Sequence, residues 1–198
     1  MAKRIDAQHN RTMLLRAARD LVATTGSTDV SARDIADRAG LSSATLYRHF
    51  DSKSDLIDAI SVDRWNRAAS WAQGTGRPDQ VLADIVSTLD RFSWMVAADA
   101  GFIAGAGLQV GRTPYAIKPM RRVFDERFDL LWTMARSTAH VRPWVDPRDV
   151  MDVMASVRDP SRRTPALRLV VSGFAASHID VDKLIKVTRM TRPSVVRL

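Results

Sequence analysis

The segment 31–53 constrains the fold more than any other part of the chain. Ser31 precedes Asp34 by three residues, which is a variant of the capping box. The serine oxygen accepts a backbone N–H, and the acidic side chain is favoured at the positive end of a helix. Gly40 suits the left-handed backbone that ends a helix, and Ser42 suits the start of the next one. We therefore expect two short helices joined by a tight turn.

The apolar residues of this segment give each expected helix one buried face. Ile35, Ala36 and Ala39 form a narrow apolar stripe on the first helix. Leu46 and Phe50 lie four residues apart on the second helix, so they share a face that packs inward. Leu41 in the turn is expected to join the core. The second helix then exposes small, aromatic and guanidinium groups: Ser43, Ala44, Tyr47 and Arg48.

This exposed face suits the major groove of duplex DNA. Serine and alanine allow a close approach of the helix, tyrosine reaches a phosphate or a thymine methyl group, and arginine forms a bidentate pair with guanine. A third helix is expected to begin near Ser52, because Ser52 and Asp55 have the spacing of another cap. Lys53 then lies in a first turn, where its charge opposes the helix dipole, so we expect it to hold a phosphate.

Over residues 11–60 the chain resembles the tetracycline-repressor (TetR/AcrR-like) family of bacterial transcription regulators. The resemblance runs through Arg11 and an amphipathic first helix ending at Gly26, through residues 30–36 and 39–42, and through Leu46-Tyr47-Arg48-His49-Phe50 followed by Lys53. It implies an all-α fold with a helix-turn-helix DNA-binding head at 1–52 and a helical ligand-sensing and dimerisation domain at 53–198. It also implies a homodimer that binds double-stranded operator DNA, most often as a repressor, and responds to a small-molecule effector.

The resemblance further implies which residues meet DNA. Positions that lie at the DNA surface in this family, mostly on phosphates, match Ser31, Arg33, Ser42, Ser43, Tyr47, His49 and Lys53. Positions that vary with operator sequence match Ala44, Thr45 and Arg48. Arg48 stands where the family often has a second tyrosine, so a guanine preference is a hypothesis for this chain. Among the individual basic groups, Lys3, Arg4 and Arg11 are also expected to face phosphates, and Asp20, Asp29 and Asp37 are expected to lie away from this basic set.

Net charge does not locate this surface. The chain carries a formal charge of +8, but residues 1–67 hold 11 Lys and Arg against 9 acidic residues, whereas the remainder holds 19 against 13. The absence of cysteine excludes disulfides, thiolate zinc sites and cysteine nucleophiles. No apolar run approaches the roughly 18 residues of a membrane helix, and no charged-then-apolar leader opens the chain. We therefore expect a cytoplasmic protein.

Beyond residue 60 the apolar periodicity is helical throughout. Glycine and proline mark loops at 74–78 and 159–165, with amphipathic helices between and after them. Methionine and aromatic side chains are dense between residues 92 and 174, and such adaptable groups are typical of a mostly apolar effector cavity. Taken one by one, each is more typical of ordinary core. The residues expected to line that cavity are Phe92, Phe102, Met120, Phe124, Phe128 and Met154, with Arg91, Arg121 and Arg122 close by. The last two main helices are expected to form the dimer interface, with Val171 and Phe174 buried between subunits.

Other classes of protein are less well supported by the sequence. His9, His49, His140 and His178 are far apart in the chain, so we expect no metal site and no cofactor. The polar groups form no recognisable nucleophile, base or metal arrangement, so an enzyme is not expected. A ligandless helical module that binds DNA or protein stays open as an alternative. Such a module would have a second domain without a cavity.

Overall fold

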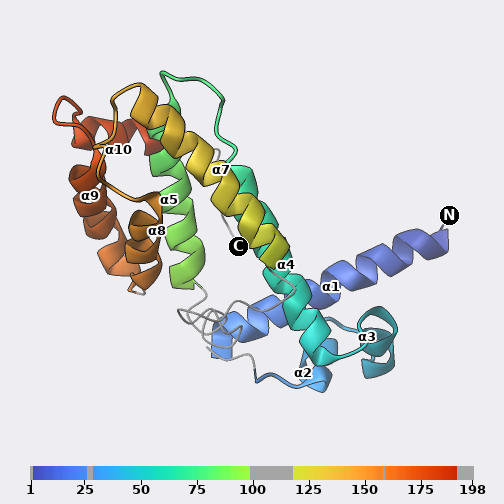
Figure 1. Cartoon of the computed structure of the whole chain (residues 1–198). Coiled ribbons are helices and arrows are strands. Elements are labelled where there is room, and N and C mark those ends of the chain that lie inside the picture. The colour runs from blue at the N-terminus through green and yellow to red at the C-terminus, as the bar shows by residue number, and fades with distance from the viewer. Residues whose placement is uncertain (1, 26–28, 99–117, 158, 191–198) are drawn as a thin grey trace. The chain divides into compact units, whose positions relative to one another are not determined.

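The computed structural model describes residues 2–25, 29–98, 118–157 and 159–190, and these form helices joined by turns and loops (Figure 1). An isolated bridge between Val141 and Ala175 is the only extended pairing within those ranges. The fold is therefore all-α, as predicted. The helices are α1 (Ala2–Thr25), α2 (Ala32–Arg38), α3 (Ser43–His49), α4 (Lys53–Trp71), α5 (Val81–Ala98), α7 (Lys118–Ser137), α8 (Pro147–Ser156), the 3₁₀ helix η2 (Pro160–Arg162), α9 (Arg163–Phe174) and α10 (Val181–Met190).

The chain divides into two compact units, and the division falls inside α4. Residues up to Trp65 form the body of the first unit, and the second begins at Asn66. The first turns of α4 belong to the first unit because Leu56, Ile57 and Ile60 are buried in its core. The expected functional boundary after residue 52 stays a prediction.

The first unit is built around one apolar cluster that α1, α2, α3 and the start of α4 enter. α2 contacts both α1 and α3, and in Figure 1 the two short helices lie beside α1 and the start of α4. The predicted inward positions of α2 and α3 are all buried, namely Ile35, Ala36, Ala39, Leu46 and Phe50. Leu41 packs against the cluster but is only partly buried. From α1 the cluster takes Leu14, Ala17, Ala18 and Val22.

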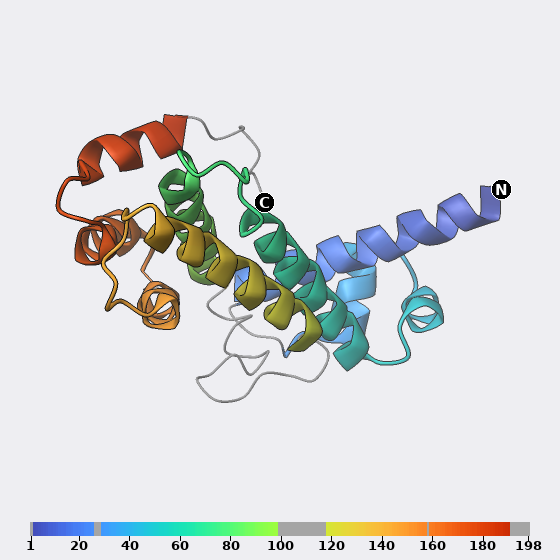
Figure 2. The ribbon, with the colours of Figure 1, turned by 45° about the horizontal axis from the view of Figure 1, so that its top comes forward.

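The second unit is organised around α5, which contacts α8, α9 and α10 (Figure 2). α7 joins this unit through aromatic contacts with α5 and α9. It is also tied to the end of α4, because Arg127 Nη1 donates a hydrogen bond of 2.8 Å to the carbonyl of Ala69. Thr88 Oγ1 of α5 donates to the carbonyl of Trp71 at 3.0 Å. The C-terminal turns of α4 are therefore anchored to two helices of this unit.

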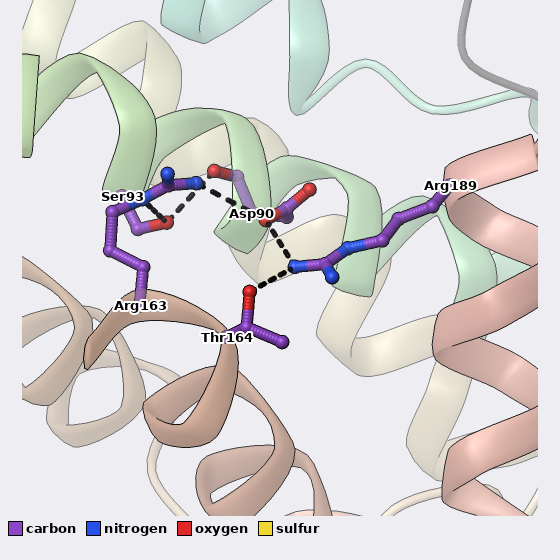
Figure 3. A network of polar contacts seen from close by, with 5 residues as sticks. All are labelled: Asp90, Ser93, Arg163, Thr164 and Arg189. Carbon is purple, nitrogen blue, oxygen red and sulfur yellow. Dashed lines mark hydrogen bonds and ion pairs between the residues drawn. The ribbon is translucent and has the colours of Figure 1, made fainter. Parts of the chain in front are cut away.

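A buried polar network joins α5, α9 and α10 (Figure 3). Asp90 Oδ1 lies 3.5 Å from Arg163 Nη2 and 3.4 Å from Arg189 Nη2. Arg163 also contacts Ser93 Oγ at 3.3 Å and stacks over the ring of Trp94 at 3.6 Å. Because the side chains of Asp90 and Arg163 are only 3% and 4% exposed, each charge depends on the other for compensation.

Candidate DNA-binding site

The turn between α2 and α3 is built by local hydrogen bonds. Ser31 Oγ accepts from the backbone N–H of Asp34 at 3.0 Å, and its hydroxyl lies 2.7 Å from Asp34 Oδ2. At the other end of α2, Gly40 has φ of +68°. The N–H of Leu41 donates to the carbonyl of Ala36 at 2.9 Å, and that of Gly40 donates to Asp37 at 3.1 Å. This pair of bonds is a Schellman motif, and it confirms the predicted tight turn.

α3 is a seven-residue helix that is capped at its start. Ser42 Oγ accepts from the N–H of Thr45 at 3.1 Å, as predicted. Leu46 is the buried residue within the helix, and Phe50 follows as its C-cap. So short a helix is held by few contacts. Its orientation therefore depends on neighbours as well as on its own core residue.

The residues predicted to meet DNA fall into two groups by burial. Ser31, Arg33, Ser42, Ala44, Tyr47 and Arg48 are exposed, whereas Ser43, Thr45, His49 and Lys53 are partly buried. Tyr47 leaves 53% of its surface exposed, which makes a large aromatic group available on one face of α3. Arg48 Nη2 lies 3.5 Å from Thr45 Oγ1, a weak contact along the same helix. The structure thus brings serine, alanine, tyrosine and arginine side chains to one open face.

Two cations of the predicted site already have acidic neighbours. Lys53 Nζ lies 3.4 Å from Asp29 Oδ1, and Arg33 Nε lies 3.7 Å from Asp37 Oδ2. The expectation that Asp29 and Asp37 lie away from these cations is therefore wrong. Exposed pairs of this kind contribute only about 0 to 1 kcal/mol, so a phosphate group is able to displace the carboxylates.

Arg11, which is expected to face a phosphate, already has two contacts within its own chain. Its Nη1 donates a hydrogen bond of 3.1 Å to the backbone carbonyl of His49. Its guanidinium carbon lies 4.3 Å from the centre of the Phe50 ring. Arg11 thus links α1 to the C-terminal end of α3. The side chains of Lys3 and Arg4 lie outside the described residues.

Three of the predicted effector residues form one aromatic column in the second unit. Phe92 of α5 stacks on Phe124 of α7 with ring centroids 5.6 Å apart, and Phe124 stacks on Phe128 at 5.9 Å. Trp132 and Phe174 continue the column at 6.0 and 5.0 Å. Met154 is fully buried and Met120 is partly buried. Phe102 lies outside the described residues.

Trp132 is a residue of this column that the sequence analysis did not single out. It is 1% exposed, and its indole Nε1 finds no hydrogen-bond acceptor among the residues that the structure describes. A buried donor without a partner costs about 1 to 3 kcal/mol. Periodicity places Trp132 on the inner face of α7, but nothing in the sequence shows that its N–H lacks a partner.

Two of the arginines expected near the effector cavity form ion pairs with acidic residues of α7. Arg121 Nε lies 3.0 Å from Asp125 Oδ1, and Arg122 Nε lies 2.7 Å from Glu126 Oε1. Burial raises the pKa of Asp125, and the charge of Arg121 offsets part of this rise. Each of these arginines is therefore engaged by an acidic residue one turn along the helix.

The residues predicted at the dimer interface lie inside a single chain. Val171 and Phe174 are 0% and 1% exposed, and Phe174 packs against Trp132. A residue with no exposed surface in one chain has none to offer a partner, so the structure does not support these two as interface residues. The other face of α9 is open, with Leu169 at 75% exposed, and Val153 of α8 is 50% exposed.

Tertiary structure also pairs two histidines that are distant in sequence. The rings of His140 and His178 have centroids 6.2 Å apart. Within the described ranges, no group of three or more His, Cys, Asp or Glu side chains is placed to hold a metal ion. In that same part of the chain, no helix is long and apolar enough to cross a membrane.

Two short capped helices, a glycine turn and an exposed second helix define a helix-turn-helix protein. Comparison with known proteins agrees, because the family model for bacterial regulatory proteins of the tetR family matches residues 14–60. The chain belongs to this TetR family.

Individual relatives extend the likeness beyond the helix-turn-helix. The chain is 30% identical over 136 residues to the HTH-type transcriptional repressor KstR2 of Mycolicibacterium smegmatis, covering 69% of this chain and 62% of that relative. It therefore spans less than two thirds of that relative's length. A TetR transcription regulatory protein from Mycobacterium vanbaalenii matches with TM-score 0.64 and 26% identity, over 87% of this chain and 99% of that one. CprB from Streptomyces coelicolor, solved with its operator sequence, shares the fold at TM-score 0.66 and 20% identity, over 93% and 96% of the two chains.

Proposed function

We propose that this chain is a transcriptional repressor that binds operator DNA as a homodimer and is released by a small-molecule effector. The observation that carries the proposal is the open face of α3, where Tyr47 and Arg48 are exposed beside the capping Ser42. The repressor name of the KstR2 relative supports the regulatory role. Catalysis is no part of the proposal, and a cytoplasmic location follows from the role.

The need for a dimer follows from the size of α3. Seven residues make too few base contacts for high affinity. Two such helices held about 34 Å apart reach successive major grooves, so a two-fold symmetric protein binds a palindromic site. The operator is therefore expected to be an inverted repeat.

The exposed faces of α8 and α9 are our candidate for the dimer surface. The two helices pack on each other, and both leave apolar side chains in solvent, Val153 and Leu169. Gly173 lies one turn after Leu169, and a Cβ added there would meet nothing within 4 Å. Small and apolar residues on neighbouring helices allow close helix packing across a two-fold axis. The candidate surface lies on the same two helices as the interface expected from the sequence, but on the opposite face of α9.

The aromatic column is our candidate for the effector site. Phe92, Phe124 and Phe128 offer ring surfaces, and Trp132 offers a buried N–H for which the described part of the chain provides no acceptor. A ligand with an apolar body and an oxygen acceptor would satisfy that donor. Binding would act by favouring a spacing of the two heads that does not match the operator, and its effect is limited by the ligand's differential affinity for the two states.

A ligandless module is the second candidate, and one observation favours it. The rings of Phe92, Phe124 and Phe128 stack on each other and are at most 6% exposed, which is also how an ordinary core packs. The two candidates differ in whether any small molecule weakens operator binding.

The proposal is tested by selecting duplexes from a randomised DNA library with the full chain. We expect enrichment of an inverted repeat with half-sites about 10 base pairs apart or at a multiple of one helical turn. Fluorescence anisotropy on the selected duplex should show binding that weakens steeply with salt. Selection without any enriched sequence, together with equal affinity for selected and scrambled duplexes, would exclude a sequence-specific repressor.

A further inference from the structure

We propose that Arg11 positions the recognition helix α3 for DNA and does not itself neutralise a phosphate. The inference rests on the proposed DNA-binding function and names a residue on which that function depends. Arg11 lies in α1, outside the helix-turn-helix. Its contacts are to the last residue of α3 and to the C-cap that follows.

The first step of the argument concerns the C-terminal end of α3. The last carbonyls of a helix have no partner within the helix, and the partial negative charge of the dipole gathers there. The carbonyl of His49, the last residue of α3, accepts the hydrogen bond from Arg11 at 3.1 Å, although the two residues are 38 positions apart. A cationic donor from α1 therefore compensates the negative end of the recognition helix.

The second step concerns the plane of the guanidinium group. It lies over the ring of Phe50 at 4.3 Å, and Phe50 is 4% exposed. The group is thus fixed at two points, by a hydrogen bond and by a cation–π contact. Arginine makes the hydrogen bond and the ring contact at once because its guanidinium group is planar and carries several N–H donors. The ammonium group of lysine is a compact point charge without a flat face.

The third step connects this anchor to the residues proposed to meet DNA. Tyr47 and Arg48 lie in the same last turn of α3 as His49. Within the helix only Leu46 is buried, so the core alone resists a rotation of this turn weakly. Fixing the carbonyl of His49 therefore also fixes the directions of Tyr47 and Arg48.

The test compares Arg11→Gln and Arg11→Lys with the control Arg16→Gln. Arg16 lies in the same helix and is exposed, so its replacement makes the same change of charge without the contact to α3. Binding to the selected operator duplex and to a scrambled duplex is measured by anisotropy over a series of salt concentrations. We expect Arg11→Gln to weaken operator binding about tenfold, in line with the loss of a charged hydrogen bond. Binding to the scrambled duplex should weaken less.

The salt dependence separates positioning from a phosphate contact. If Arg11 positions α3, the slope of log affinity against log salt stays that of the Arg16→Gln control, and Arg11→Lys does not restore operator discrimination. If Arg11 binds a phosphate, Arg11→Gln flattens the slope by about one, both duplexes lose affinity alike, and Arg11→Lys restores it. The second pattern would overturn the inference.

Hydrogen exchange in the free protein provides a readout that needs no DNA. Amides of α3 should exchange faster in Arg11→Gln than in Arg16→Gln, while amides in the middle of α1 exchange alike. Unchanged exchange in α3 would also overturn the inference. If the wild-type chain binds no duplex but α3 is loosened as expected, the structural role holds and the proposed function has failed.

Discussion

Lys53 Nζ lies 3.4 Å from the carboxylate of Asp29, so the lysine proposed to hold a phosphate has a competing anion within its own chain. Asp29 is almost fully exposed in this pair, with 97% of its side chain accessible. The pair is therefore weak in solution. It nonetheless has to open before Lys53 engages DNA.

Replacing Asp29 by Asn should strengthen DNA binding a few-fold. The change removes both the competing carboxylate and a negative charge near the proposed phosphate contact. Anisotropy titrations at low and moderate salt measure the gain, with Asp129→Asn on the exposed side of α7 as a control of equal charge in the second unit. An equal gain in both variants would show that net charge, and not the pair with Lys53, is responsible.

Arg48 and Lys53 should differ in what they contribute to binding. Arg48→Ala is expected to relax discrimination at one base pair by about 1 to 3 kcal/mol, because arginine reads guanine through two hydrogen bonds. Lys53→Ala should weaken binding to all duplexes alike and flatten the salt dependence by about one. Selection of randomised duplexes with each variant measures the first effect, and salt titrations measure the second. The same loss of specificity in both variants would contradict this division.

Leu169→Asp should give folded monomers, whereas Phe174→Asp should unfold the second unit. Leu169 is 75% exposed in one chain, so a charge there disturbs only a partner surface, but Phe174 is 1% exposed and packs on Trp132. Sedimentation and circular dichroism distinguish the two outcomes. A Leu169→Asp variant that sediments as a dimer would place the interface elsewhere.

Asp90→Ala should destabilise the second unit by about 3 to 5 kcal/mol, since it removes a buried carboxylate that is paired with the guanidinium of Arg163. Arg189→Ala should cost less, because the Arg189 side chain is 34% exposed and water replaces part of its contact. Denaturant unfolding of the two variants gives the comparison. Equal losses of unfolding free energy would show that the contact of Asp90 with Arg189 contributes as much as its contact with Arg163.

Trp132→Phe should reduce the response to an effector about tenfold or more while operator affinity stays within a few-fold. The variant keeps an aromatic ring in the column but removes the buried indole N–H, which has no acceptor among the residues with described positions. Candidate effectors come from a thermal-shift screen of apolar compounds that carry a carbonyl or carboxylate, and release of the selected duplex is the readout. Full response in the variant would mean that the ligand does not use this donor.

Features that depend on neighbouring residues follow from the amino-acid sequence alone. The caps at Ser31 and Ser42, the turn at Gly40 and the inward faces of α2 and α3 all follow from interactions within a few positions. Such interactions are encoded by residue type and spacing, because a capping oxygen reaches only the amides of its own first turn. The helical character of the second unit was also predictable, because apolar periodicity depends on residues within a few turns of each other.

Which groups meet across the chain depends on tertiary packing and is not visible in the sequence. Arg11 reaches α3, Lys53 reaches Asp29, and Asp90 is shared by two arginines from α9 and α10. It also decided that Phe174 faces Trp132 within one chain while Leu169 faces outward. Periodicity shows that a helix has an apolar side, but not what covers it. That depends on how distant helices pack, and the packing is set by the summed burial of many side chains and not by any local pattern.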